Sequence, residues 1–208
     1  YVELIDPGIA ERSLNGLTLV LLDTHPGADG LGNIGEISRV WSLDGTATGR
    51  NGLLLLGNGY DTANPFAAVT SALTAIADPP GMGVDVLSSN DGLALLIVRG
   101  FSGHPGQDLD AANNNVLDAT PWTEVVDSIA IGAMTYGLPT LNQAGYTPDN
   151  LSRGGRFTDL VANSAARWYG GDLLGPAGTS TAFDPAQRFD LTTAVPAGAA
   201  TPGQHNLG

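Results

Sequence analysis

The most constraining feature of this sequence is a series of short apolar runs, each closed by turn residues. Residues 17–22, 52–57 and 93–99 consist largely of leucine, isoleucine, valine and alanine. Runs of this kind, bounded by Gly, Asn or Asp, are typical of buried β-strands. The unbroken run at 17–22 predicts burial on both faces of a sheet, and the run at 93–99 predicts a central strand. The 29 glycines and 13 prolines supply the turns that many short strands need, so we predict an all-β fold.

Further strands are predicted at residues 1–5, 36–41 and 123–131, where β-branched, aromatic and polar residues alternate. Turns are predicted at 13–16 and at Asp44-Gly45. Beyond residue 132 the pattern weakens, so 138–155 is expected to be a loop and 163–168 a helical turn. From about residue 172 the chain is rich in Ala, Thr, Pro and Gly, which predicts an irregular C-terminal segment. No domain boundary is evident, and we expect a single domain over residues 1–208.

One segment differs from the strand pattern. Asn64 is a suitable helix N-cap, and Pro65 suits the first helical position. Apolar residues then recur at helical spacing, at Phe66, Val69, Leu73 and Ile76. The sequence therefore predicts one short helix between residues 64 and 79, beside the strands and several long loops.

The composition excludes several classes of function. The net charge is −13, from 21 acidic residues against 8 arginines, and the chain has no lysine. A basic face for nucleic acid is therefore not expected, because phosphate neutralisation needs clustered Lys and Arg. The absence of cysteine excludes disulfides, thiolate zinc sites and cysteine nucleophiles. No apolar run is long enough to span a membrane.

Residues 108–122 are rich in oxygen ligands of the kind that Ca²⁺ takes. With Asp110 at the first position of a loop like that of an EF-hand, Asn114 stands at the fifth and Asp118 at the ninth. Val116 then offers its backbone carbonyl at the seventh position, and Asp108 serves as a substitute ligand. These residues are the candidate calcium ligands of the chain.

The same loop departs from the full EF-hand pattern at three positions. Ala112 supplies no ligand, Pro121 stands where a bidentate Glu is usual, and Asn115 replaces the usual Gly. Asn tolerates the left-handed backbone conformation better than most residues, so Asn115 remains compatible with the loop. The alternative is a solvated turn in which Asn and Asp side chains bond their own backbone. Both interpretations, a degenerate calcium loop and an Asx-rich turn, stay open.

No catalytic set can be assembled from the sequence. Residues 30–35 match G-x-G-x-x-G, but a strand is predicted after them, whereas a dinucleotide site needs a helix there. Ser102 and His104 lie close together without a third group to orient them. Trp41, Trp122 and Trp168 could stack on sugar rings if exposed, although at least two are expected to anchor the core. We therefore predict that the chain is not an enzyme.

In this order of segments the chain resembles the lamin-tail-like domain. The matching pieces are residues 1–8, 14–20, 52–57, 93–122 and the Thr-Pro-Gly-x-x-Asn ending at 201–206. The resemblance covers most of the chain and implies an immunoglobulin-like β-sandwich. Family members occur on bacterial surface and secreted proteins, sometimes beside a nuclease domain, and in nuclear lamins. It therefore implies a secreted, extracellular or cell-surface location for this chain.

The family's usual first strand, which precedes the Tyr-Val-Glu-Leu motif, is missing from this sequence. The resemblance thus implies either a disordered or cleaved segment before Tyr1 or a sheet edge that another chain can fill. From this we expect a non-enzymatic structural protein, a homo-oligomer or polymer that forms a filament, tube or surface assembly stabilised by Ca²⁺. The alternative is a carbohydrate- or surface-binding module of a secreted hydrolase or nuclease, with a glycan as its partner.

Overall fold

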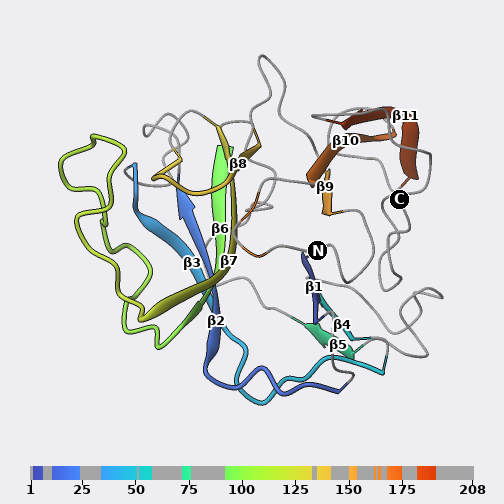
Figure 1. The fold of residues 1–208 in the computed structure, drawn as a ribbon, viewed down its shortest axis with the longest axis horizontal. Coiled ribbons are helices and arrows are strands. Elements are labelled where there is room, and N and C mark those ends of the chain that lie inside the picture. Colours follow the sequence, from blue (N-terminus) through green and yellow to red (C-terminus); the bar gives the residue numbers. More distant parts are fainter. Residues whose placement is uncertain are drawn as a thin grey trace.

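The computed structural model describes residues 2–6, 11–23, 34–50, 52–57, 72–75, 92–132, 135–141, 150–153, 162, 164, 168–174 and 182–190. All regular elements in this part of the chain are strands, which confirms the all-β prediction (Figure 1). Their bounds are β1 Val2–Ile5, β2 Leu17–Asp23, β3 Ile37–Ser42, β4 Leu53–Gly57, β5 Ala72–Ala75, β6 Gly92–Arg99, β7 Glu124–Gly132, β8 Thr140–Leu141, β9 Asn150–Arg153, β10 Trp168–Leu174 and β11 Ala182–Asp190.

The strands form three sheets. The largest is five-stranded, with the order β3-β2-β6-β7-β8, and two smaller sheets have the orders β1-β4-β5 and β11-β10-β9. Most neighbours are antiparallel, but β4 pairs with β5 and β7 with β8 in parallel. Strand β6 lies at the centre of the largest sheet, as its apolar sequence predicts. No apolar helix of a length that would cross a bilayer occurs in the described part of the chain.

The five-stranded sheet and the sheet of β1, β4 and β5 are linked by successive antiparallel pairs, which we call the ribbon. Strand β2 pairs with β3, residues 11–14 pair with 46–49, and β1 pairs with β4. Thr18 lies opposite Ser42, and the same register leads to the bridge between Ser13 and Ala47. The ribbon then bends, so that β2 and β3 belong to the large sheet while β1 and β4 belong to the smaller one.

The bend is fixed by two turns that bond each other. Gly16 donates its N–H to Asp44 Oδ1 at 2.7 Å, and Gly45 donates to Asn15 Oδ1 at 2.8 Å. The φ angles of Gly16 and Gly45 are +79° and +78°, a conformation that other residues adopt only with strain. The turns predicted at 13–16 and Asp44-Gly45 are therefore confirmed, and they meet across the ribbon.

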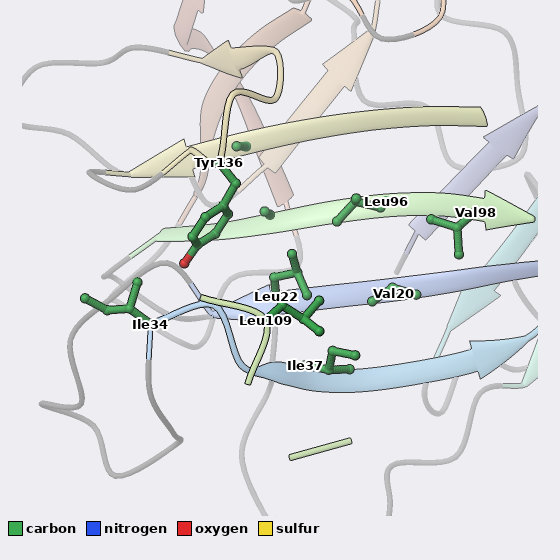
Figure 2. Close-up of a cluster of buried hydrophobic side chains, with 10 residues drawn as sticks. Val20, Leu22, Ile34, Ile37, Leu96, Val98, Leu109 and Tyr136 are labelled. Atoms are coloured by element: carbon green, nitrogen blue, oxygen red, sulfur yellow. The ribbon is translucent and has the colours of Figure 1, made fainter. Parts of the chain in front are cut away.

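Both faces of β2 are buried, as its unbroken apolar run predicts. On one face Leu19 packs with Leu54 and Leu56 of β4 and with Leu4 of β1, so the bent ribbon covers this face. The partly buried residues Trp41, Leu95 and Ile97 complete that cluster. On the other face Val20 and Leu22 pack with residues of β3, β6 and β7 (Figure 2).

The helix predicted between residues 64 and 79 is wrong where the structure describes it. Ala72–Ala75 forms strand β5, which pairs in parallel with β4, opposite Leu54 to Gly57. Pairing with an existing strand outweighs a local helical preference, because propensity is a weak prior against tertiary contacts. The remainder of that segment lies outside the described residues.

Three further predictions for the C-terminal half are wrong in part. The expected loop at 138–155 contains β8 and β9, and Trp168, the last residue of the helical turn expected at 163–168, begins β10. Most of 163–167 lies outside the described residues. The segment from about residue 172, expected to be irregular, contains the end of β10 and all of β11. Strands β9 to β11 contain Gly, Asp and Arg residues and Pro185, so the apolar alternation that reveals a strand is missing from them.

Candidate functional site

The candidate site is a long connection between β6 and β7, residues 101–122, which we call the Asx strap. The strap is closed at its base by backbone bonds, because Thr123 donates its N–H to Arg99 O at 2.9 Å and Ser102 donates to Pro121 O at 2.8 Å. Leu109, near its middle, is fully buried in the same cluster as Val20 and Leu22. The strap therefore lies on the face of the central sheet that the ribbon leaves open, and Figure 2 shows Leu109 among Leu22 and Ile37 of that face.

The strap pairs with the beginning of β3. Ile37 donates its N–H to Gln107 O at 2.9 Å, and Leu109 donates to Gly35 O at 3.0 Å. An isolated bridge joins Glu36 and Asp108 between these bonds. Gly35 has φ +80°, and a Cβ there would lie 2.6 Å from Asp110 Cβ, so only glycine fits. The strap thus occupies the outer edge of β3 at this end of the sheet.

Asp110 holds the centre of the strap. Its side chain is fully buried, and its two carboxylate oxygens accept the N–H groups of Asn114 at 3.0 Å and Asn115 at 2.8 Å. The Asp110 carbonyl also accepts the N–H of Asn113 at 2.8 Å. A buried carboxylate requires such partners, since leaving it unbonded would be costly. Asp110 therefore organises the turn that follows it.

Asn115 connects the strap to the chain beyond β7. Its Oδ1 accepts two backbone N–H groups, from Thr135 at 2.7 Å and from Tyr136 at 2.8 Å. Its φ of +66° confirms the expectation that this position adopts the left-handed conformation. The contact with 135–136 is not visible in the sequence, because residues twenty positions apart meet only through the tertiary fold.

Tyr136 is the residue of this site that the sequence did not reveal. Its ring is buried in the cluster under the strap, and its hydroxyl donates to Asp23 O at 2.7 Å. Burial raises the pKa of Tyr136 well above its ordinary value, and the backbone of Gly35 acts in the opposite direction. The nearby carboxylates of Asp110 and Asp23 raise this pKa further. The phenol is thus neutral and serves as a hydrogen-bond donor.

The structure places the five predicted calcium ligands in one turn but in different surroundings. Asp110 is buried, whereas Asp108, Asn114, Asp118 and Val116 are exposed. Three of the exposed side chains accept backbone N–H groups within the strap: Asp108 Oδ1 that of Asp110 at 2.9 Å, Asn114 Oδ1 that of Val116 at 3.0 Å and Asp118 Oδ2 that of Ala112 at 3.3 Å.

These bonds have the pattern of the Asx-rich turn. Within the described residues no group of three or more His, Cys, Asp or Glu side chains is arranged to hold a metal ion. A carboxylate oxygen that accepts one N–H retains a second lone pair, so these bonds do not prevent ligation. The calcium loop therefore stays a prediction.

The other residues that the sequence singled out are found in structural surroundings. His104 is exposed, and its Nδ1 lies 3.0 Å from the carbonyl of Pro105. Trp41 and Trp122 are partly buried and pack against the two clusters on opposite faces of the central sheet, which confirms the expected core role for two of the three tryptophans. The strand that follows residues 30–35 is β3, which confirms that no helix begins there.

The comparisons with known proteins are silent on this chain. No family model matches it, and neither a curated protein nor a solved structure is found to be similar to it.

Proposed function

We propose that this chain is a non-enzymatic, extracellular structural subunit that associates with copies of itself by adding strands at the edge of a sheet. As part of this proposal, the chain has the immunoglobulin-like β-sandwich fold that its resemblance to the lamin-tail-like domain implies. Packing of β1 and β4 against the central sheet supports the two-layered arrangement. The observation that carries the proposal is that, among the described residues, β1 pairs with β4 alone.

In the described part of the chain, strand β1 is paired on one side only. Its register with β4 runs from Val2 opposite Leu56 to Ile5 opposite Leu53, and no described residue forms a ladder with its other side. Asp6 donates its N–H to Gly52 O at 2.9 Å, so this pair is hydrogen-bonded. Because antiparallel residues alternate in direction, Val2 and Leu4 also face β4. The N–H and C=O groups of Glu3 and Ile5 therefore point outward.

A free edge of this kind favours a second strand, because its backbone groups are already extended and aligned. The three-stranded sheet has β5 at its opposite edge, where no described residue pairs with Ala72–Ala75 on the outer side. A sheet that adds strands at both edges grows without closing, and this would give the filament, tube or surface assembly. The net charge of −13 opposes contact between copies, so association should strengthen with ionic strength or Ca²⁺.

The alternative is a module that binds carbohydrate or a surface. Such a module needs aromatic rings presented together on one face. Trp41 and Trp122 instead pack against clusters on opposite faces of the central sheet. We therefore favour self-association, and a glycan array with reproducible hits would favour the alternative.

The test is sedimentation velocity over a range of protein concentrations, in low and high salt, with Ca²⁺ and with chelator. We expect the weight-average mass to rise with concentration and with salt. In the variant Ile5→Pro this rise should be lost, because proline removes an outward N–H but no bond to β4. A chain that stays monomeric under every condition would refute the proposal.

The matched control is Leu4→Pro, the same substitution at the neighbouring position. It removes an N–H that faces β4, so it should lower the melting temperature, whereas Ile5→Pro should leave it nearly unchanged. Circular dichroism melts of both variants separate loss of association from loss of folding.

A further inference from the structure

The two turns at the bend of the ribbon have nearly the same sequence and the same hydrogen bonds. Residues 13–16 read Ser-Leu-Asn-Gly, and residues 42–45 read Ser-Leu-Asp-Gly. In each turn the residue after the glycine donates its N–H to the leucine carbonyl at 3.1 Å. The serine Oγ accepts the N–H of the Asn or Asp residue, at 3.3 Å in the first turn and 3.2 Å in the second. We call residues 13–17 and 42–46 together the twin turn.

Both halves of the twin turn are type II turns. Gly16 and Gly45 have positive φ, whereas φ is negative at Asn15 and Asp44. Together with the bond that closes each turn, these signs define type II, in which ψ of the residue before the glycine is about +120°. In an L-residue the next nitrogen lies beside Cβ only when ψ is about −120°. The first turn therefore holds the Gly16 nitrogen away from the Asn15 side chain.

The crossed bonds of the twin turn also hold the groups through which an Asn-Gly pair reacts. The Gly16 N–H donates to Asp44 Oδ1 at 2.7 Å, and Asn15 Oδ1 accepts the N–H of Gly45 at 2.8 Å. All four residues are exposed, so water reaches these groups. The twin turn thus restricts the direction of the reacting groups and not their contact with solvent.

An asparagine that precedes glycine can lose its side-chain amide, because glycine has no Cβ to hinder attack by its nitrogen. The Gly16 nitrogen forms a bond to Asn15 Cγ, and the bond from Cγ to Nδ2 breaks. A solvent base takes the proton of the Gly16 N–H, solvent gives a proton to the leaving nitrogen, and ammonia departs. Water then opens the succinimide ring and leaves aspartate or isoaspartate at position 15.

This attack is blocked in the closed twin turn. The Asn15–Gly16 peptide must rotate by about 120° about the Asn15 Cα–C bond to bring the nitrogen beside Cγ. The rotation takes the Gly16 N–H away from Asp44, and the Asn15 side chain must leave the N–H of Gly45. Both crossed bonds therefore break before the reaction begins.

We infer that Asn15 is a latent deamidation site, which the twin turn keeps unreactive and which forms isoaspartate only when the bend of the ribbon opens. Isoaspartate adds a methylene group to the main chain, so the type II turn cannot form again after the reaction. The modification therefore makes an opening of the bend permanent. This inference is independent of self-association, because it concerns contacts within one chain.

The first test compares the wild-type chain in native buffer and in urea, at the same pH and temperature. Peptide mapping by mass spectrometry after digestion at arginine measures deamidation at Asn15 and distinguishes isoaspartate from aspartate. The other Asn-Gly pairs, at Asn51 and Asn58, show in the same urea samples how fast an unfolded pair reacts. We expect Asn15 to react several-fold more slowly in native buffer than in urea. Equal rates at Asn15 would overturn the inference.

The second test uses two variants that remove the same charge. Asp44→Ala removes the acceptor of the Gly16 N–H, so deamidation of Asn15 in native buffer should rise several-fold. Asp44→Asn keeps an acceptor oxygen and should stay near the wild-type rate, and all three chains should react alike in urea. Circular dichroism establishes that both variants are folded. If Asp44→Ala is folded and reacts no faster than wild type, the crossed bond does not protect Asn15; if it unfolds, the wild-type comparison still decides.

Discussion

The two faces of the central sheet are covered in different ways. One face is covered by the bent ribbon, whose β1 and β4 add leucines that already belong to a hydrogen-bonded ladder. The other face is covered by the Asx strap, which places Leu109 in the core but has little regular structure of its own. The ribbon keeps its shape through backbone pairing between its strands. The strap keeps its shape through hydrogen bonds from backbone N–H groups to the side chains of Asp110 and Asn115. An irregular cover thus depends on a few polar residues.

The largest expected effect compares one buried leucine from each cover. Leu54 and Leu109 are both fully buried, and replacing either with alanine should lower the free energy of unfolding by about 2–5 kcal/mol. We expect Leu54→Ala to lie at the upper end, because the paired ribbon cannot collapse into the cavity, and Leu109→Ala at the lower end. Urea denaturation measures both, and a larger loss for Leu109→Ala would contradict the comparison.

The second comparison places the same chemistry in two surroundings. Asp110 in the strap and Asp44 in the ribbon each accept backbone N–H groups, but Asp110 is buried and Asp44 is exposed. Asp110→Ala should cost about 1.5–3 kcal/mol, as expected for bonds to a buried charge. Asp44→Ala should cost about 0.5–1 kcal/mol, because water can replace its carboxylate. Equal losses in thermal or urea unfolding would show that burial does not set the difference.

Calcium distinguishes the two interpretations of the strap. If the strap binds Ca²⁺, a tenfold excess over the dissociation constant stabilises the fold by about 1.4 kcal/mol. The melting temperature should then rise with Ca²⁺ and fall again with chelator. Asp118→Ala is the matched variant, because this exposed side chain makes only one long bond, at 3.3 Å. A calcium loop predicts that the variant loses the rise, whereas an Asx-rich turn predicts no rise in either protein.

The smallest effect concerns the phenol beneath the strap. Tyr136→Phe removes the bond to Asp23 O and should cost about 0.5–1.5 kcal/mol near neutral pH. Burial raises the pKa of Tyr136 in the folded chain, so above pH about 10 an unfolded tyrosine ionises first. The stabilisation from the phenol is present below that pH and is lost as pH rises. The difference between the two proteins should therefore shrink in alkaline denaturation curves.

Much of the fold was predictable because the leucine-rich strands carry their own signal. The strands predicted at 17–22, 52–57 and 93–99 agree with β2, β4 and β6 to within one residue at each end. The helix at 64–79 was wrong over β5 because periodicity in sequence does not reveal a neighbouring strand to pair with. Strands β9 to β11 were missed because their Gly, Asp and Arg residues and Pro185 interrupt the apolar alternation.

The candidate site was predictable only in its composition. The sequence located the Asx-rich segment and the left-handed position at Asn115, because both are local properties of the chain. It did not show that Asp110 would be buried, nor that Asn115 would bond to Thr135 and Tyr136. Those facts depend on where the strap lies on the sheet. The sequence thus predicted the residue types of the site but not their contacts with distant parts of the chain.

The bent ribbon also has a consequence for how the chain folds. Its pairing begins beside Asp23 and Glu36, which are close in sequence, and ends at Val2 and Leu56. Each new pair adds little loop entropy once its neighbour has formed, so the two strands can zip from the turn outward. One inserted residue between Leu14 and Leu17 would shift the pairing of 11–14 with 46–49 by one position. The placement of Leu14 in the core is therefore set by the spacing at the bend.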